Sequence, residues 1–160
     1  MAHVELATEA ARLLSGRSIA TAESCTAGRI AESLASVDKA VEFLRGGLVA
    51  YQDRVKRSFL GVTAASTLSS EAAAQMALGA CRMFESEVAV ATTGVAGDEP
   101  EDGVPPGTVF IATAVDGVVQ VHRYRYEADP PTVCDHARHQ ALVDLQNALA
   151  DAPRRPTDAR

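Results

Sequence analysis

The 160-residue chain is poor in aromatic residues, with four Phe, three Tyr and no Trp. A surface on which nucleic-acid bases stack would therefore have few rings to draw on. Basic residues are also outnumbered, because 15 Lys and Arg face 21 Asp and Glu and leave a net charge of −6. Both shortages argue against a general binder of nucleic acid or of anionic membrane, which needs a basic face. One phosphate-sized pocket stays compatible with this charge, since it needs only local donors.

Cysteines and long apolar runs are scarce as well. The three cysteines, Cys25, Cys81 and Cys134, are widely spaced and form neither a disulfide framework nor a CxxC metal half-site. No apolar run approaches the roughly 18 residues of a membrane span. The N-terminus lacks the basic start and the apolar stretch of a signal peptide. These absences predict a reduced, cytoplasmic domain with neither a nucleic-acid nor a membrane partner.

What the chain does contain is an alternation of helical and strand patterns. Apolar spacing predicts helices over 4–14, through 30–37, over 53–60, from Ser69 or Ser70 to 84, and over 132–150. Asp53 and one of the two serines are the expected N-caps. Short apolar segments predict strands over 18–22, 46–51 and 88–92. Two further strands, 108–115 and 118–126, flank the hairpin signal Asp116-Gly117.

This order of elements predicts the α/β class in a single domain. We expect a three-layer α/β/α arrangement over residues 1–152, with a mixed sheet and an antiparallel hairpin near the C-terminal end. Residues 153–160, which include two prolines, are predicted to be a disordered tail.

Two strand-to-helix turns, 23–28 and 93–97, combine hydroxyl groups with glycines at the edge of the sheet where ligands usually bind. Ser24 lies beside helix-start N–H groups that can bind a phosphate or an oxyanion. Alternatively, Ser24 or Thr26 simply caps the helix. Cys25 is either a nucleophilic thiol at a helix N-terminus or, as we favour, a buried structural thiol, because no histidine partner is visible nearby.

Tyr51 and Lys56 are the candidate proton carriers. A serine nucleophile needs a base, and a tyrosinate or a lysine of lowered pKa can serve. Desolvation, or a nearby cation such as Arg54 or Arg57, would lower the pKa of Lys56. The alternative is a solvated lysine on a basic helix.

The remaining polar clusters are less specific. The acidic run at 98–102 is most simply a solvated loop. Asp135, His136 and His139 share one predicted helix, but they lack the spacing of a known zinc motif and a further ligand. We therefore predict neither a metal nor a cofactor.

Several motifs occur in the order and spacing of one known family. They are Thr-Ala-Glu-Ser-Cys-Thr-Ala-Gly at 21–28, Gly-Gly-Leu-Val-Ala-Tyr-Gln-Asp-Arg-Val-Lys at 46–56, Leu-Gly-Val at 60–62, Thr-Gly-Val-Ala-Gly at 93–97 and Pro-Gly-Thr-Val at 106–109. In these segments the chain resembles the CinA C-terminal domain family, in its stand-alone form, over about residues 4–150.

The resemblance implies a nicotinamide-nucleotide amidohydrolase of pyridine nucleotide salvage, which needs no metal. Such an enzyme converts nicotinamide mononucleotide and water to nicotinic acid mononucleotide and ammonia. The family's catalytic serine, tyrosine and lysine match Ser24, Tyr51 and Lys56. Ser24 would attack the carboxamide carbon, Lys56 and Tyr51 would relay its proton to the leaving ammonia, and N–H groups at the following helix start would hold the oxyanion.

The resemblance also implies the residues that contact this small-molecule nucleotide and the assembly state. The predicted substrate-binding residues are Cys25, Thr26, Gly28, Gly46, Gly47, Thr93, Gly94, Ala96 and Gly97. A homodimer or a higher homo-oligomer is expected.

The sequence departs from the family pattern where substrate is held. Val104 stands where lysine is usual, Pro130 and Cys134 stand where arginines are usual, and four carboxylates occupy 98–102 in place of glycines. If these positions face the pocket, they weaken the attraction for a dianionic phosphate. Otherwise the loop points to solvent, and compensating charge comes from Arg123, Arg125 or Arg138.

Three hypotheses follow from these patterns. The complete set of Ser24, Tyr51 and Lys56 favours the mononucleotide amidohydrolase. The altered loop favours an amidase of the same fold with another amide substrate. A non-catalytic nucleotide-binding module is the third hypothesis.

Overall fold

The computed structural model describes residues 2–156, in which five strands form one sheet in the order β2-β1-β3-β4-β5. The strands are β1 (Ile19–Glu23), β2 (Leu44–Val49), β3 (Val88–Gly94), β4 (Thr108–Val115) and β5 (Val118–Arg125). β1 runs parallel to both β2 and β3, whereas β4 is antiparallel to β3 and β5. The predicted mixed sheet with its C-terminal hairpin is confirmed.

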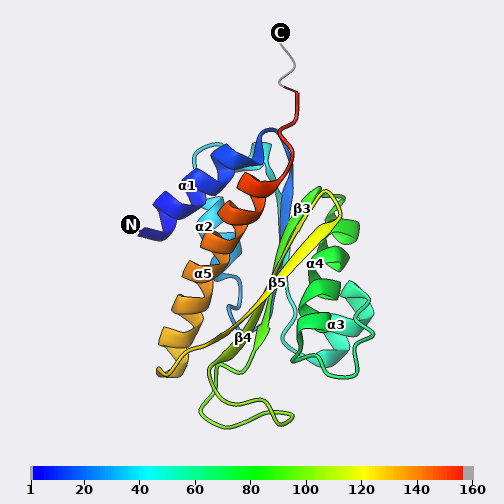
Figure 1. Ribbon diagram of the computed structural model, residues 1–160, viewed down its shortest axis with the longest axis vertical. Coiled ribbons are helices and arrows are strands. Elements are labelled where there is room, and N and C mark those ends of the chain that lie inside the picture. The colour runs from blue at the N-terminus through cyan, green and yellow to red at the C-terminus, as the bar shows by residue number, and fades with distance from the viewer. Residues whose placement is uncertain (1, 157–160) are drawn as a thin grey trace.

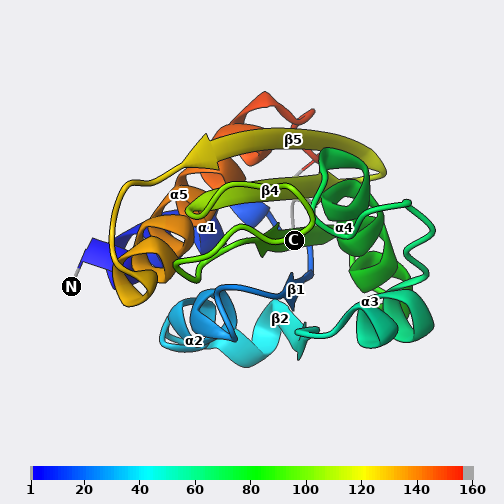
Figure 2. The ribbon, with the colours of Figure 1, turned by 90° about the horizontal axis from the view of Figure 1, so that it is seen from below.

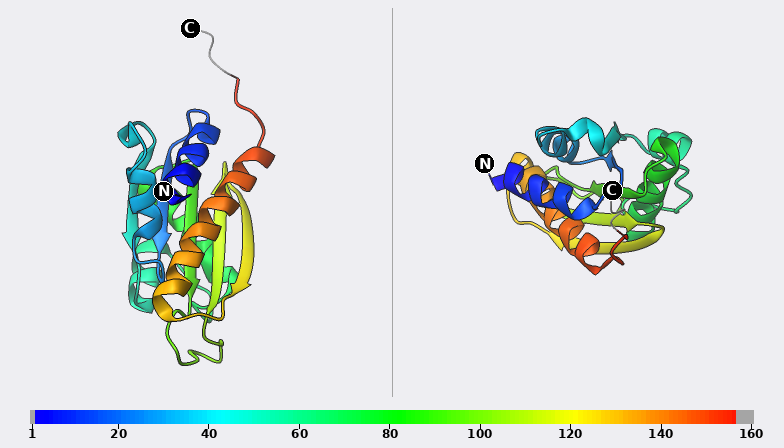
Figure 3. Two further views of the ribbon diagram at one scale, coloured as in Figure 1. Left: turned by 90° about the vertical axis from the view of Figure 1, so that its left-hand side faces the viewer. Right: turned by 90° about the horizontal axis from the view of Figure 1, so that it is seen from above.

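Helices cover both faces of this sheet (Figures 1 and 3). On one face lie α1 (Ala2–Leu14), α2 (Arg29–Ala35) and α5 (Pro130–Asp151), and on the other lie α3 (Asp53–Leu60) and α4 (Ser70–Phe84). A short 3-10 helix, Ala40–Glu42, precedes β2. The α/β/α layering expected from the sequence is therefore present.

The two faces of the sheet differ in the size of their side chains. Alternate residues of a strand point to opposite faces, and the face under α1, α2 and α5 carries larger residues such as Ile19, Val88 and Ile111. The face under α3 and α4 is largely alanine: Ala20, Ala22, Ala89, Ala91, Ala112 and Ala114. α4 packs onto it through small residues of its own: Ala72, Ala73, Ala77 and Ala80. Close packing of alanine layers explains how a chain with so few aromatic residues still fills a core.

The connections between the strands create a topological switch point at the carboxyl ends of the central strands. α2 crosses one face between β1 and β2, whereas α3 and α4 cross the other face between β2 and β3. The carboxyl ends of the neighbouring strands β1 and β3 therefore open between diverging connections, where ligands bind in such sheets. Figure 2 looks onto this edge, with the loop that joins β3 to β4 in front.

The helix starts follow the sequence signals except at α2 and α3. Gly28 is the N-cap of α2, so neither Ser24 nor Thr26 caps this helix. Ser69 is the N-cap of α4, and its hydroxyl accepts a hydrogen bond from the N–H of Ala72 at 3.1 Å, so this prediction is confirmed. The Asp53 prediction is wrong, because Gln52 is the N-cap of α3 and Asp53 is its first helical residue.

Part of the predicted C-terminal tail lies within the described residues. The carbonyl of Pro153 accepts a hydrogen bond from Arg17 at 2.9 Å. Arg155 forms ion pairs with Glu87 at 3.2 Å and with Asp116 at 2.9 Å. Residues 157–160 lie outside the described residues, so disorder over 153–160 stays a prediction. Between residues 2 and 156, no helix is both long and apolar enough to cross a membrane.

Candidate active site

A pocket of about 200 Å³ lies at the edge where β1 and β3 end. Its lining brings together the three residues predicted to be catalytic, Ser24, Tyr51 and Lys56. The other lining residues are Cys25, Leu68, Gly94, Ala96, Gly97 and Glu101. These residues come from segments that are far apart in the sequence and that lie close together only in the folded protein.

The remaining predicted substrate-binding residues, Thr26, Gly28, Gly46, Gly47 and Thr93, do not line the pocket. The hydroxyl groups of Thr26 and Thr93 are buried and are used in hydrogen bonds within the protein. Gly28 precedes α2, and its N–H donates to a carboxylate. Gly46 and Gly47 lie inside β2, where an added Cβ would meet the side chains of Phe84 and Thr21. The contacts observed for these residues are within the protein, and substrate binding by them stays a prediction.

Glu23, the last residue of β1, carries a fully buried carboxylate that binds the start of α2. The carboxylate accepts four hydrogen bonds: from Thr26 Oγ1 (2.7 Å) and from the N–H groups of Gly28 (3.0 Å), Ile30 (3.1 Å) and Ala31 (2.8 Å). A negative charge at a helix N-terminus is favourable, and these donors have no partner within the helix. The expectation that the helix start holds an oxyanion is therefore wrong, because an internal carboxylate already occupies it.

Ser24 lies in a turn that the rest of the protein holds rigid. Its N–H donates to the carbonyl of Thr92 at 3.0 Å, and its carbonyl accepts from the N–H of Ala27 at 3.0 Å. Among the described residues, the N–H groups of Cys25 and Thr26 donate no hydrogen bond. Of the two residues, Cys25 lines the pocket, whereas Thr26 is fully buried and does not. The N–H of Cys25 is therefore the backbone donor next to Ser24 that is left for an oxyanion.

Lys56 is 3% exposed on the inner face of α3, so it is not the solvated lysine of the alternative interpretation. Burial lowers the pKa of its amine, which favours the neutral form that a general base needs. The cationic neighbours are not the cause of this shift. Arg57, for example, donates to the carbonyl of Ala64 at 2.9 Å.

An acidic partner fixes the position of Lys56. Asp53 Oδ1 lies 3.9 Å from Lys56 Nζ and accepts a hydrogen bond from Thr67 Oγ1 at 2.6 Å. The carbonyl of Thr67 in turn accepts from Thr93 Oγ1 at 2.7 Å. The lysine is thus connected to the turn after β3, a role for Asp53 and Thr67 that sequence reasoning missed. The spacing of Asp53 and Lys56, three residues apart on a helix, was the available signal.

Tyr51 lies at the open rim of the pocket. It follows β2 closely and is 64% exposed. The N–H of the preceding residue, Ala50, donates to the carbonyl of Glu23 at 2.7 Å. This bond ties the segment that carries Tyr51 to the end of β1, next to Ser24.

Cys25 has the properties of a structural thiol. It is 3% exposed, and burial raises its pKa to about 12. The carbonyl of Cys25 accepts a hydrogen bond from the Cys134 thiol at 3.0 Å, which attaches the first turns of α5 to the Ser24 turn. A neutral thiol is a poor nucleophile, so the hydroxyl of Ser24 is the better candidate.

The acidic segment 98–102 divides between pocket and solvent. All of these residues are exposed, but Glu101 also lines the pocket, whereas Glu99 and Asp102 do not line it. Asp98 borders a second hollow of about 290 Å³, which shares Gly97 with the first. One of the four carboxylates therefore faces the site directly.

Of the three arginines considered as compensating charges, one lies close to the site. Arg125 lines the second hollow. Arg123 lies over the ring of Phe110, with its guanidinium carbon 5.6 Å from the ring centroid. Arg138 pairs with Asp135 at 3.1 Å and with Glu32 at 3.8 Å. Only Arg125 among these three is therefore positioned to meet a ligand that extends past Gly97.

The other polar clusters of the described residues hold no comparable chemistry. Within residues 2–156, no three His, Cys, Asp or Glu side chains gather to hold a metal ion. His136 packs against the ring of Tyr126, and His139 against that of His3.

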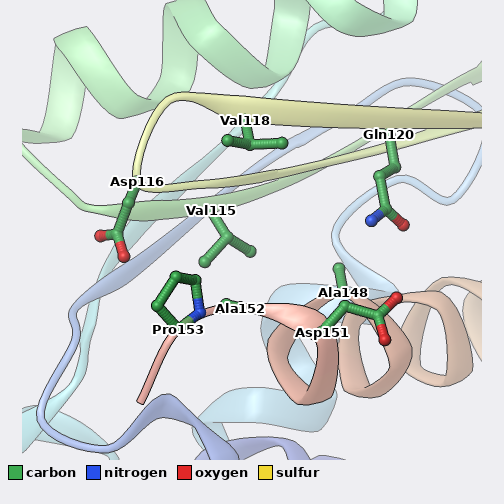
Figure 4. A pocket seen from close by; sticks show the side chains of 8 residues that line it. All are labelled: Val115, Asp116, Val118, Gln120, Ala148, Asp151, Ala152 and Pro153. Carbon is green, nitrogen blue, oxygen red and sulfur yellow. The ribbon is translucent and has the colours of Figure 1, made fainter. Parts of the chain in front are cut away.

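A further hollow of about 270 Å³, under the β4–β5 turn, is lined mainly by apolar side chains such as Val115, Val118 and Ala148 (Figure 4). It lies at the opposite end of the strands from Ser24, because Val115 pairs with Val88 at the start of β3.

The fold and the pocket define a class: a small α/β protein with a serine and a buried lysine at the switch point of its sheet. Residues 3–149 match the CinA C-terminal domain, and the chain belongs to this family. It is similar to protein YdeJ of Escherichia coli K12, with 34% identity over 137 residues that cover 82% of this chain and 80% of that protein.

Other similarities agree with this assignment. A CinA-like protein of Mycolicibacterium vanbaalenii is 43% identical over 121 residues, and the chain spans only 28% of that relative's length. The crystal structure of the competence damage-inducible protein A from Klebsiella pneumoniae superimposes with a TM-score of 0.90 at 34% identity, and the match covers 94% of this chain and 99% of that one. An Escherichia coli protein of the CinA superfamily gives a TM-score of 0.86 at 30% identity.

Proposed function

We propose that this protein is an amidohydrolase that converts nicotinamide mononucleotide and water to nicotinic acid mononucleotide and ammonia. One observation carries the proposal: Ser24 and the buried, pKa-lowered Lys56 line the same pocket, with Tyr51 at its rim. A hydroxyl beside a neutral amine is the arrangement that activates a serine nucleophile.

The reaction divides into acylation and hydrolysis. Ser24 Oγ attacks the carboxamide carbon while Lys56 Nζ takes its proton, and the N–H group of Cys25 stabilises the oxyanion. The C–N bond then breaks, and the proton passes through Lys56 and Tyr51 to the nitrogen, which leaves as ammonia. Water, deprotonated by the same amine, attacks the acyl carbon and releases the acid and free Ser24.

Arg125 supplies a place for the phosphate end of the substrate. The hollow that contains Arg125 adjoins the Ser24 pocket at Gly97. A substrate with its carboxamide at Ser24 would pass over Gly97 and present its phosphate to this guanidinium. Arginine is well suited to phosphate because its donors match phosphate oxygens.

A second candidate is an amidase of the same fold for an unphosphorylated amide. Glu101 favours it, because this carboxylate lines the pocket and repels a dianion that must pass close to it. The two candidates share the catalytic residues and differ only in the substrate.

Ammonia release from a panel of amides distinguishes these functions. Purified protein is incubated with nicotinamide mononucleotide, nicotinamide riboside and simple amides. Turnover of the mononucleotide, with a KM well below that for the riboside and with no turnover of simple amides, is the expected result. Turnover of unphosphorylated amides without turnover of the mononucleotide supports the second candidate. Calorimetric binding without turnover of any amide would contradict both and favour a non-catalytic module.

The lysine has a matched control in the same chain. Lys56→Ala should lower turnover at least about 10³-fold, as loss of a catalytic group does in other serine hydrolases. Lys39→Ala, at an exposed position outside the pocket, should leave turnover unchanged. Equal rates in the two variants would remove Lys56 from the mechanism.

The expected homodimer or higher homo-oligomer stays a prediction. Light scattering on the same preparation of purified protein tests it.

A further inference from the structure

Glu101 gives the pocket an electrostatic character that the catalytic residues do not explain. Among the residues that line the pocket, Lys56 carries the one amine and Glu101 the one carboxyl group. When Lys56 is neutral and ready to accept a proton, the carboxylate of Glu101 is the one charge that remains among the residues that line the pocket. The pocket in its reactive form therefore favours a positive charge on the ligand.

The loop fixes the backbone of Glu101, while its side chain is exposed at the pocket. Glu101 and Val104 exchange two backbone hydrogen bonds, of 3.1 and 2.8 Å. Val104 is half-buried against the core between the sheet, α3 and α4. Further along, the N–H of Gly107 donates to the carbonyl of Val95 at 2.7 Å and closes the base of the loop. Glu101 is thus held on the same core layer that positions Lys56.

Carboxamides of the nicotinamide type differ in ring charge according to whether the ring nitrogen is substituted. Free nicotinamide is neutral, whereas attachment of a ribosyl or methyl group to the ring nitrogen leaves a permanently cationic pyridinium. Hydrolysis of the amide then places a carboxylate on the same ring, which a fixed negative charge repels. A carboxylate in the pocket would therefore favour the substituted substrate and assist release of the acid product.

We propose that Glu101 is a specificity determinant that selects carboxamides on a cationic pyridinium ring over neutral carboxamides. The inference rests on the proposed function, because it places the ring beside Ser24. It names the substrate class as N-substituted nicotinamides, with or without a phosphate. The carboxylate of Glu101 in the acidic loop weakens the attraction for a phosphate, but it attracts the cationic pyridinium ring.

Binding to a protein that does not turn over tests this directly. Ser24→Ala protein is titrated in a calorimeter with 1-methylnicotinamide and with nicotinamide, which differ in one methyl group and one charge. The cation should bind about fivefold to tenfold more tightly, the effect of one partly screened charge pair. Adding Glu101→Gln should reduce that ratio to about one, and adding Glu99→Gln, the same change two residues away outside the pocket, should not.

The outcomes separate this inference from the proposed function. A ratio that is unchanged by Glu101→Gln, or no detectable binding of the cation, would overturn the role of Glu101. Wild-type protein is assayed in parallel for ammonia release from nicotinamide mononucleotide and nicotinamide riboside. A cation preference that depends on Glu101, in a protein that hydrolyses neither compound, would overturn the proposed function and leave the selectivity standing.

Discussion

The two turns that form the pocket are held in place by different means. The turn after β1 carries Ser24 and is bound to the buried carboxylate of Glu23 and to the end of β3. The loop after β3 is tied down at its base and at the Glu101–Val104 pair, while its tip is exposed. The proposed nucleophile thus lies on a fixed framework, and the charge that we propose for selectivity lies on the more open segment. This division matches the need for catalytic groups to be held within narrow geometric limits.

The largest effect is expected when the buried carboxylate of Glu23, which holds the turn after β1, is removed. Glu23→Ala leaves the N–H groups of Gly28, Ile30 and Ala31 without their acceptor. The free energy of unfolding should therefore fall by about 2–4 kcal/mol. Urea denaturation followed by circular dichroism measures it. Glu99→Gln, which removes a charge from the exposed loop, is the control. A loss below about 0.5 kcal/mol for Glu23→Ala, the range of ordinary surface changes, would contradict this account of the turn.

A smaller effect is expected for Arg125, which lines the second hollow beyond Gly97. Arg125→Ala should raise KM for nicotinamide mononucleotide about tenfold, since one charged hydrogen bond is worth about 1.5 kcal/mol or more. KM for nicotinamide riboside, which has no phosphate, should change little. Arg123→Ala, which removes a guanidinium stacked on Phe110, is the matched control. An equal rise in KM for both substrates would argue against a phosphate contact at Arg125.

The pH dependence of turnover tests the partner of Lys56. Lys56 must lose its proton to act as a base, so kcat/KM should rise with pH through its lowered pKa, below the ordinary lysine value of 10.5. Burial lowers this pKa, and Asp53 opposes the shift by stabilising the cation. Asp53→Asn keeps an oxygen to accept from Thr67 and should therefore move the rising limb to lower pH. Asp38→Asn, on an exposed segment away from the pocket, should leave it in place. A shift to higher pH in Asp53→Asn would contradict the ion pair.

The smallest effect is expected at the tip of the loop. Glu99 is exposed and does not line the Ser24 pocket. Glu99→Gln should change the free energy of unfolding by no more than about 0.5 kcal/mol, and kcat/KM for nicotinamide mononucleotide by less than twofold. Thermal denaturation and the ammonia assay measure both. A large change in either would mean that the tip, and not only Glu101, faces the substrate.

Much of the fold was predictable because its signals are local. Asp116-Gly117 marks the β4–β5 turn, and Ser69 marks the start of α4. Asp53 was misplaced because two polar residues in succession can both precede a helix. Its carboxylate is used by Thr67 and Lys56 instead, which the helix pattern alone does not reveal.

The candidate catalytic residues were predictable from the sequence, and the residues that support them were not. Ser24, Tyr51 and Lys56 were identified from turn position and family motifs, and they line one pocket. Glu23 was missed because its role depends on where the chain goes next. Its carboxylate meets the N–H groups of residues five to eight positions later, a contact that the strand pattern does not specify. A glutamate at the end of an otherwise uncharged buried strand was the signal that was available.

Ammonia release from nicotinamide mononucleotide by the wild type and by Ser24→Ala tests the central claim most directly. The wild type should turn over, and Ser24→Ala should lose at least about 10³-fold in rate while it unfolds at the same urea concentration. Ser36→Ala, an exposed serine at the end of α2, should keep full activity. Turnover that persists in folded Ser24→Ala, or a wild type that releases no ammonia from this substrate, would contradict the assignment of this pocket.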